Sequence, residues 1–217
     1  YVDQIFKKDK KIVLEAIKVD GTLISYVDKS LTKDREVILN AVKGHGGALE
    51  YADDAFRKDR EIVLEAVKQF GSALQYADED FKKDNEIVLE AVKKDGYALE
   101  YADDSFKKKK EIVLIAVKCE GSAIQFADDS FRKDNEIVLE AIKKDGYALE
   151  YADDIFKKNK EIVLEAVKNS GSSFDYADEG LKYDKDVIIE AVRQYHSSAL
   201  EYIVDENLTK DKEFILE

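Results

Sequence analysis

A strict 25-residue repeat is the feature of this sequence that most limits its fold. One glycine recurs at this spacing from Gly21 to Gly171, and one alanine recurs at the same spacing from Ala16 to Ala191. An aromatic residue follows the same step, at Tyr1, Tyr26, Tyr51, Tyr76, Tyr101, Phe126, Tyr151 and Tyr176. Repeats of this length are typical of solenoids, in which each unit buries its apolar side against the next. The sequence therefore predicts a single array over residues 1–217, with an atypical last unit from about residue 194.

A 50-residue period lies over the 25-residue one. Residues 72–121 and 122–171 are identical at 39 of 50 positions, which indicates that the array grew by copying pairs of units. The residue after the repeated glycine also alternates, with Ser72 and Ser122 interleaved with Tyr97 and Tyr147.

The sequence of each unit predicts two short helices. In the unit that contains Asp84, the first helix covers residues 84–96. Asp84 is placed to accept the free amides of the first turn, and Lys93 and Lys94 stand in the last turn. Gly96 stands where a left-handed residue would end the helix. The helix is apolar over most of its circumference, so we expect it to be covered on two sides.

The second helix is expected to begin just after the glycine and to last about two turns. Ser72 and Gln75 fit a capping box at its start. Asp103 would end the helix and cap a turn that carries Phe106. We expect the recurring aromatic rings to pack in the core.

A β-structure does not fit the same pattern. The apolar residues at positions 137, 138, 139, 141 and 142 do not alternate as the faces of a strand should. The units also lack the leucine-rich repeat frame and are too short for propeller blades. The predicted fold is all-α: an α-solenoid of eight to nine 25-residue helix-turn-helix repeats.

The unit from Lys83 to Ala102 resembles the repeat known as the domain of unknown function DUF4116. Its Asp-Asn-Glu-Ile-Val-Leu-Glu-Ala-Val start and its Gly-Tyr-Ala-Leu-Glu-Tyr-Ala end carry the resemblance. The likeness extends over nearly the whole chain and weakens where Lys109 and Asn159 replace the capping aspartate and where Gly44 and Gly47 flank Gly46. The resemblance implies helical repeats and brings no activity, cofactor or catalytic residue.

The composition excludes several classes of protein. One cysteine cannot form an internal disulfide, and one cysteine with two histidines cannot supply a zinc site of nitrogen and sulfur ligands alone. No apolar run approaches the roughly 20 residues that cross a bilayer, and no signal peptide is visible. We expect a cytoplasmic protein, or one delivered to a host cytoplasm, without membrane association. The repeat is already in phase at Tyr1 and continues to Glu217, as in a fragment of a longer protein.

Acidic pairs recur along the array and would form a ladder along one edge of a solenoid. They are Asp53, Asp54, Asp103, Asp104, Asp128, Asp129, Asp153 and Asp154. The ladder could attract a basic partner or mimic the charge of a nucleic acid, but adjacent lysines and arginines favour a simpler role in ending helices and in solubility. Calcium is disfavoured because no loop has the spacing of its ligands, and no metal or cofactor is expected.

Other candidates are places where one unit departs from its copies. Ile115 replaces a glutamate and is expected to face outward, and Phe70 and Tyr195 put rings at turn tips. Tyr97 and Tyr147 recur at alternate turns. His45 and His196 stand at turns without a recognisable nucleophile, so no catalytic residue is assigned. The net charge of −13 opposes direct binding to nucleic acid.

We therefore expect a noncatalytic scaffold that binds a protein partner along an extended surface. One alternative is an acidic inhibitor that mimics nucleic acid and occupies a nucleic-acid-binding protein. Another is a structural spacer.

Overall fold

The computed structural model describes residues 5–194, which form helices joined by short turns and contain no β-strand. The predicted all-α repeat fold is confirmed. Two compact units make up the chain, Tyr1–Cys119 and Glu120–Glu217. That one array runs through both units stays a prediction.

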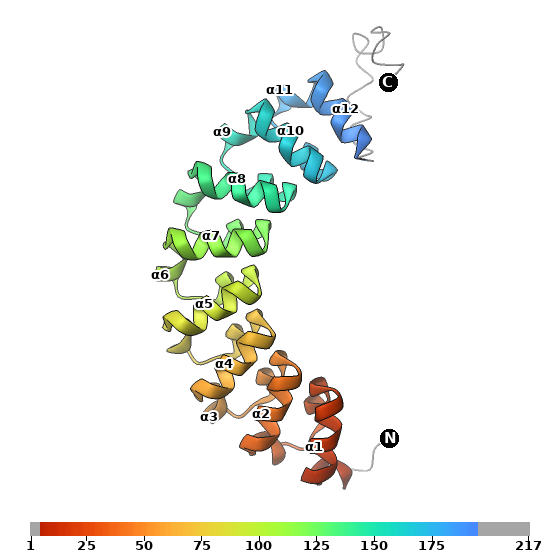
Figure 1. Cartoon of the computed structure of the whole chain (residues 1–217), viewed down its shortest axis with the longest axis vertical. Coiled ribbons are helices and arrows are strands. Elements are labelled where there is room, and N and C mark those ends of the chain that lie inside the picture. Colours follow the sequence, from red (N-terminus) through yellow and green to blue (C-terminus); the bar gives the residue numbers. More distant parts are fainter. Residues whose placement is uncertain (1–4, 195–217) are drawn as a thin grey trace. The chain divides into compact units, whose positions relative to one another are not determined.

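Each repeat contributes one long α-helix of nine or ten residues. In the first unit these helices are α1 (Lys10–Val19), α2 (Arg35–Gly44), α4 (Arg60–Gln69), α5 (Asn85–Lys94) and α7 (Lys110–Cys119). In the second unit they are α8 (Asn135–Lys144), α10 (Lys160–Asn169) and α12 (Lys185–Arg193). Within each unit the long helices pack side by side in chain order (Figure 1).

The second helix of each repeat is a six-residue 3-10 helix rather than an α-helix. These segments are η2 (Gly21–Tyr26), η4 (Gly46–Tyr51), η5 (Gly71–Tyr76) and η7 (Gly96–Tyr101) in the first unit. In the second unit they are η8 (Gly121–Phe126), η10 (Gly146–Tyr151) and η11 (Gly171–Tyr176). Within each unit they contact one another in chain order and form a second layer against the α-helices.

A third short helical segment, which the sequence suggested only as a turn, joins one repeat to the next. It is a 3-10 helix in η1 (Phe6–Lys8), η3 (Leu31–Lys33), η6 (Phe81–Lys83) and η9 (Asp129–Lys133). It is a single α-turn in α3 (Asp54–Arg57), α6 (Asp104–Lys107), α9 (Asp154–Lys157) and α11 (Glu179–Lys182). Asp103 caps α6, which carries the buried Phe106, as predicted.

The core lies between the two layers and between successive repeats. On α4, the side chains of Ile62, Val63, Ala66 and Val67 are completely buried. This helix contacts α2 on one side and α5 on the other, and it also contacts η4 and η5. The expectation that the apolar circumference is covered on two sides is confirmed. A repeat of this kind cannot bury its core without its neighbours.

The repeated glycine serves a close contact, and the prediction of a left-handed helix end was wrong. The residue before it is extended, as at Asp95 with φ −153° and ψ 112°, and this residue ends the α-helix. A Cβ built on Gly71 would lie 2.3 Å from the carbonyl oxygen of Ala91 in the next repeat. Glycine is therefore needed because no side chain fits between η5 and α5.

The predicted capping box was also wrong. Gln75 donates to the carbonyl of Ser72, 3.1 Å away, whereas in a capping box its side-chain oxygen would accept from a backbone amide. The Ser72 hydroxyl donates to the Asp95 carboxylate of the next repeat, and Ser122 donates to Asp145 over 2.8 Å. These hydrogen bonds tie neighbouring repeats together, which a pattern read within one helix does not reveal.

The capping aspartate of each long helix has a second role. Asp84 accepts from the amides of Glu86 and Ile87, both at 3.0 Å, as predicted. It also pairs with Arg60 of the preceding repeat, which reaches Glu86 over 2.6 Å as well. The Arg60 guanidinium lowers the pKa of Asp84 below its ordinary value.

We expect Gly71→Ala to lower the free energy of unfolding by about 1 to 3 kcal/mol, because the backbone of one repeat must move away from the next. Gly180→Ala is the matched control, since a Cβ there meets only the Asp178 side chain at 3.4 Å. The control should be neutral or slightly stabilising. Urea unfolding followed by circular dichroism measures both, and equal midpoints for the two variants would contradict the close-contact explanation.

We expect Asp84→Asn to lower the urea midpoint at pH 7, because asparagine keeps the cap but loses the ion pair. The folded pKa of Asp84 is lowered, so its stabilisation is present above the ordinary value of about 3.9 and is lost as the pH falls through the lowered pKa. The gap between wild type and variant should therefore close below about pH 4. The control is Asn159→Asp at the cap of α10. The counterpart of Arg60 for this cap is Asn135, which carries no charge, so the new aspartate gains no ion pair with it. A gap that persists in acid would refute the role of the ion pair.

Candidate functional site

The recurring aromatic rings lie at the surface of the repeats, and the prediction that they form the core was wrong. Each ring is the last residue of a 3-10 helix, and none of those at positions 26, 51, 76, 101, 126, 151 and 176 is buried. Tyr26 and Tyr51 are 68% and 42% exposed. Leu49 and Leu74, two residues before a ring, are completely buried in the core. The rings therefore lie at the edge of the core and keep part of their surface exposed.

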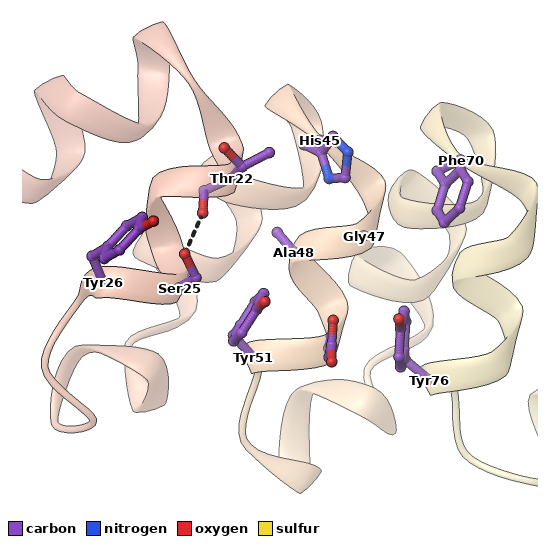
Figure 2. A pocket seen from close by; sticks show the side chains of 10 residues that line it. Thr22, Ser25, Tyr26, His45, Gly47, Ala48, Tyr51, Phe70 and Tyr76 are labelled. Carbon is purple, nitrogen blue, oxygen red and sulfur yellow. Dashed lines mark hydrogen bonds between the residues drawn. The ribbon is translucent and has the colours of Figure 1, made fainter.

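A hollow of about 310 Å³ lies over η4 in the first unit. Figure 2 shows Tyr26, Tyr51 and Tyr76 along one side of it, with His45 and Phe70 across from Tyr51 and Tyr76. These residues come from three successive repeats. Ala48 and Gly47 lie between the two sides in Figure 2. Thr22, Ser25 and Glu50 complete the lining.

The hydroxyl groups of the hollow take part in local hydrogen bonds. The Ser25 hydroxyl donates to the Thr22 carbonyl at 2.9 Å, and the Thr22 hydroxyl donates to Asp20 at 2.6 Å. Both hydroxyls are engaged within their own turn, and neither donates to a histidine as an activated nucleophile would. Burial and then the Glu50 carboxylate raise the pKa of Tyr76, so its hydroxyl stays protonated.

Two residues that depart from the repeat pattern form one wall of the hollow. The rings of His45 and Phe70 are stacked, with centroids 6.1 Å apart and planes inclined by 28°. Phe70 is 39% exposed. The sequence singled out Phe70 as a turn-tip ring, and the structure places it beside a histidine that the sequence treated as an isolated turn residue.

Tyr97 and Tyr147, the other ring candidates, lie on η7 and η10. Tyr97 is 38% exposed. Tyr147 is half-buried, and its ring meets Tyr176 and Tyr151 edge to face, with centroids 5.1 Å and 6.2 Å away. Hydrogen bonds to Tyr176 and Glu150 raise the pKa of Tyr147 well above its usual value.

The first aspartate of each acidic pair caps the short segment that follows it. Asp53, Asp103, Asp128 and Asp153 each accept from the amide two residues on. Two of them also lie near a lysine of the preceding repeat, with Lys33 at 3.9 Å from Asp53 and Lys133 at 3.5 Å from Asp153.

The second aspartates lie in the first turn of the same segments. Asp104 pairs with Lys107 at 3.1 Å and Asp129 with Arg132 at 3.4 Å, while Asp54 and Asp154 are exposed. The predicted role of these pairs in local structure is confirmed at the caps. A binding role for them stays a prediction.

The remaining candidates do not join the hollow. Ile115 is half-buried on α7, as are Glu65 and Glu90 at the same place in other repeats. Tyr195 lies outside the described residues, as does His196. Within residues 5–194 no three His, Cys, Asp or Glu side chains gather as metal ligands, and no helix there is long and apolar enough to span a bilayer.

Sequence reasoning missed the hollow itself. Its signal was present in Gly47, which stands where Tyr97 and Tyr147 stand in other repeats. On the sequence alone, the absence of a ring at position 47 indicates only a weaker match to the DUF4116 repeat.

The domain of unknown function DUF4116 matches six segments of the chain, residues 1–32, 9–57, 34–81, 59–107, 109–157 and 159–203, of which the first four overlap. No curated protein and no solved structure matches the chain.

Proposed function

Since the chain belongs to the DUF4116 family, whose description assigns no activity, we propose its function from its geometry: a noncatalytic helical-repeat scaffold that binds a protein partner along the layer of 3-10 helices. The observation that carries this proposal is the row of tyrosines, one per repeat, that keep part of their surface exposed at the edge of the core.

The row is suited to a macromolecular partner. Tyrosine offers a large, rigid, partly apolar surface at low entropic cost and is enriched in protein interfaces. Consecutive 3-10 helices of the first unit place Tyr26, Tyr51, Tyr76 and Tyr101 one repeat apart. An extended segment of a partner protein could follow such a row over several repeats.

The charge pattern favours this function over the acidic inhibitor. A nucleic-acid mimic needs carboxylates presented to solvent at regular spacing. Here Asp53, Asp103 and Asp153 accept hydrogen bonds at caps, and Asp84 pairs with an arginine of the neighbouring repeat. These carboxylates are therefore engaged in helix caps and in an ion pair between repeats.

We expect a triple variant Tyr51→Ser, Tyr76→Ser and Tyr101→Ser to bind the partner at least about tenfold more weakly than wild type, because interface tyrosines are frequent hot spots. Affinity capture from the source cell, with quantitative mass spectrometry, identifies proteins that wild type retains and the variant loses. The matched control carries Lys43→Ser, Lys68→Ser and Lys93→Ser on the exposed sides of α2, α4 and α5. It should retain the partner.

Two outcomes would overturn the proposal. Binding that disappears by about 0.15 M salt and competes with DNA would indicate the acidic inhibitor. Equal capture by both triple variants, or no specific partner at all, would indicate a surface other than the tyrosine row or a structural spacer. Circular dichroism of each variant confirms that it is folded.

A further inference from the structure

One repeat of the chain shows how an aromatic ring packs on the layer of 3-10 helices. In η10 the residue after the glycine is Tyr147, whose ring lies against Tyr151 and Tyr176. Hydrogen bonding to Tyr176 and then to Glu150 raises the pKa of its hydroxyl. A phenol ring therefore fits against two tyrosines of adjacent repeats, with Glu150 near its hydroxyl.

The same surroundings recur without the central ring around Gly47. Counting 100 residues back, Glu150, Tyr151 and Tyr176 correspond to Glu50, Tyr51 and Tyr76, all three of which line the hollow. Tyr147 corresponds to Gly47, which has no side chain, and the His45 imidazole lies against Gly47, 2.7 Å from where a Cβ would be. The hollow of about 310 Å³ is at the lower end of the range for ligand sites, about 300 to 1,000 Å³.

Two further residues that differ from their counterparts in the second unit line the hollow. Asp145 and Ser170 of the second unit correspond to His45 and Phe70, whose stacked rings lie across from Tyr51 and Tyr76 (Figure 2). A ring that entered beside Gly47 would meet aromatic groups on both sides. Aromatic pairs add about 0.5 to 1.5 kcal/mol beyond the area that they bury.

The charge of the hollow determines which polar substituent on the incoming ring is favoured. Its lining includes the Glu50 carboxylate and neither lysine nor arginine. A hydrogen-bond donor is complementary to Glu50, whereas a phosphate or carboxylate on the incoming group would be repelled. A phenol hydroxyl is a donor of this kind, and it is the group that Tyr147 presents to Glu150.

We propose that the hollow beside Gly47 receives the side chain of a tyrosine from an extended segment of the protein partner, against Tyr51 and Tyr76, the counterparts of the two tyrosines that Tyr147 contacts in its own repeat. This assignment rests on the proposed function and names the chemistry that the partner must carry. The ring would lie between Tyr51 and Tyr76 on one side and His45 and Phe70 on the other, with its hydroxyl donating to Glu50.

The test uses the full chain and the peptide N-acetyl-Ala-Tyr-Ala-amide, titrated to millimolar concentration and followed by amide shifts in NMR. Shifts are expected at residues 45–51 and 70–76. The double variant His45→Asp and Gly47→Tyr rebuilds the sequence Asp-Gly-Tyr-Ala-Leu-Glu-Tyr, which the fold already accommodates at 95–101 and 145–151. It should stay folded and bind the peptide at least tenfold more weakly, because its own ring fills the hollow.

Two other variants probe the mechanism. Tyr147→Gly removes the internal ring and should create new peptide-dependent shifts at residues 145–151. Glu50→Gln should lower the affinity for the tyrosine peptide severalfold and leave the affinity for the corresponding phenylalanine peptide unchanged. A phosphotyrosine peptide should bind at least tenfold more weakly than the tyrosine peptide.

The inference is overturned if the tyrosine peptide causes no shifts at these residues, or if the double variant binds it as wild type does. Preferential binding of an arginine peptide at the same residues would assign the hollow to a basic side chain and overturn it as well. In each case, loss of the partner from the triple tyrosine variant would still support the proposed function, so that the two failures are distinguishable.

Discussion

The contact between a glycine and the carbonyl of the alanine 20 residues later is the constraint on which the stacking of repeats depends. A Cβ on Gly21, Gly46, Gly71, Gly121 or Gly146 would lie 2.1 to 2.5 Å from the oxygen of that alanine. The 3-10 helix of one repeat therefore rests directly on the backbone of the next α-helix. Both residue types must recur at 25 residues because each repeat meets its neighbour through the same pair. The buried alanine has a matching reason to be small, since larger side chains would separate the layers.

With the spacing set in this way, polar groups at fixed positions meet across each junction. Arg35, Arg60 and Lys10 reach the capping aspartate and the glutamate two residues later in the next long helix, and Lys160 reaches Asp184 and Asp186 in the same way. Ser72 and Ser122 reach an aspartate of the next repeat on the opposite end of that helix. A basic residue in the first turn is unfavourable for its own helix dipole, and the acidic groups of the neighbouring repeat offset this cost.

What the sequence could predict follows from the range of each interaction. The caps of the long helices, the Glu90 to Lys93 pair and the aliphatic core depend on residues within one turn or one period, so their patterns are visible along the chain. The 3-10 geometry of the second helix was missed because the place of Gly71 depends on its close approach to the carbonyl of another repeat and not on its own turn. The aromatic row was assigned to the core for a related reason: periodicity shows that Tyr51 keeps a constant place but does not show whether that place is buried, like that of Leu49, or partly exposed.

In an array of near copies, a binding site can arise from the removal of a side chain as readily as from an addition. Removing the ring at position 47 costs the core nothing, because Ala48 and Leu49 are buried independently of it. Drift alone would scatter such departures over the surface, as with Ile115 on α7, which does not line the hollow beside Gly47. Gly47, His45 and Phe70 instead depart together and line the same hollow, from the ends of successive α-helices and the start of η4. Their convergence on one place, around groups that hold a tyrosine elsewhere in the chain, is what distinguishes this hollow from an imperfect repeat.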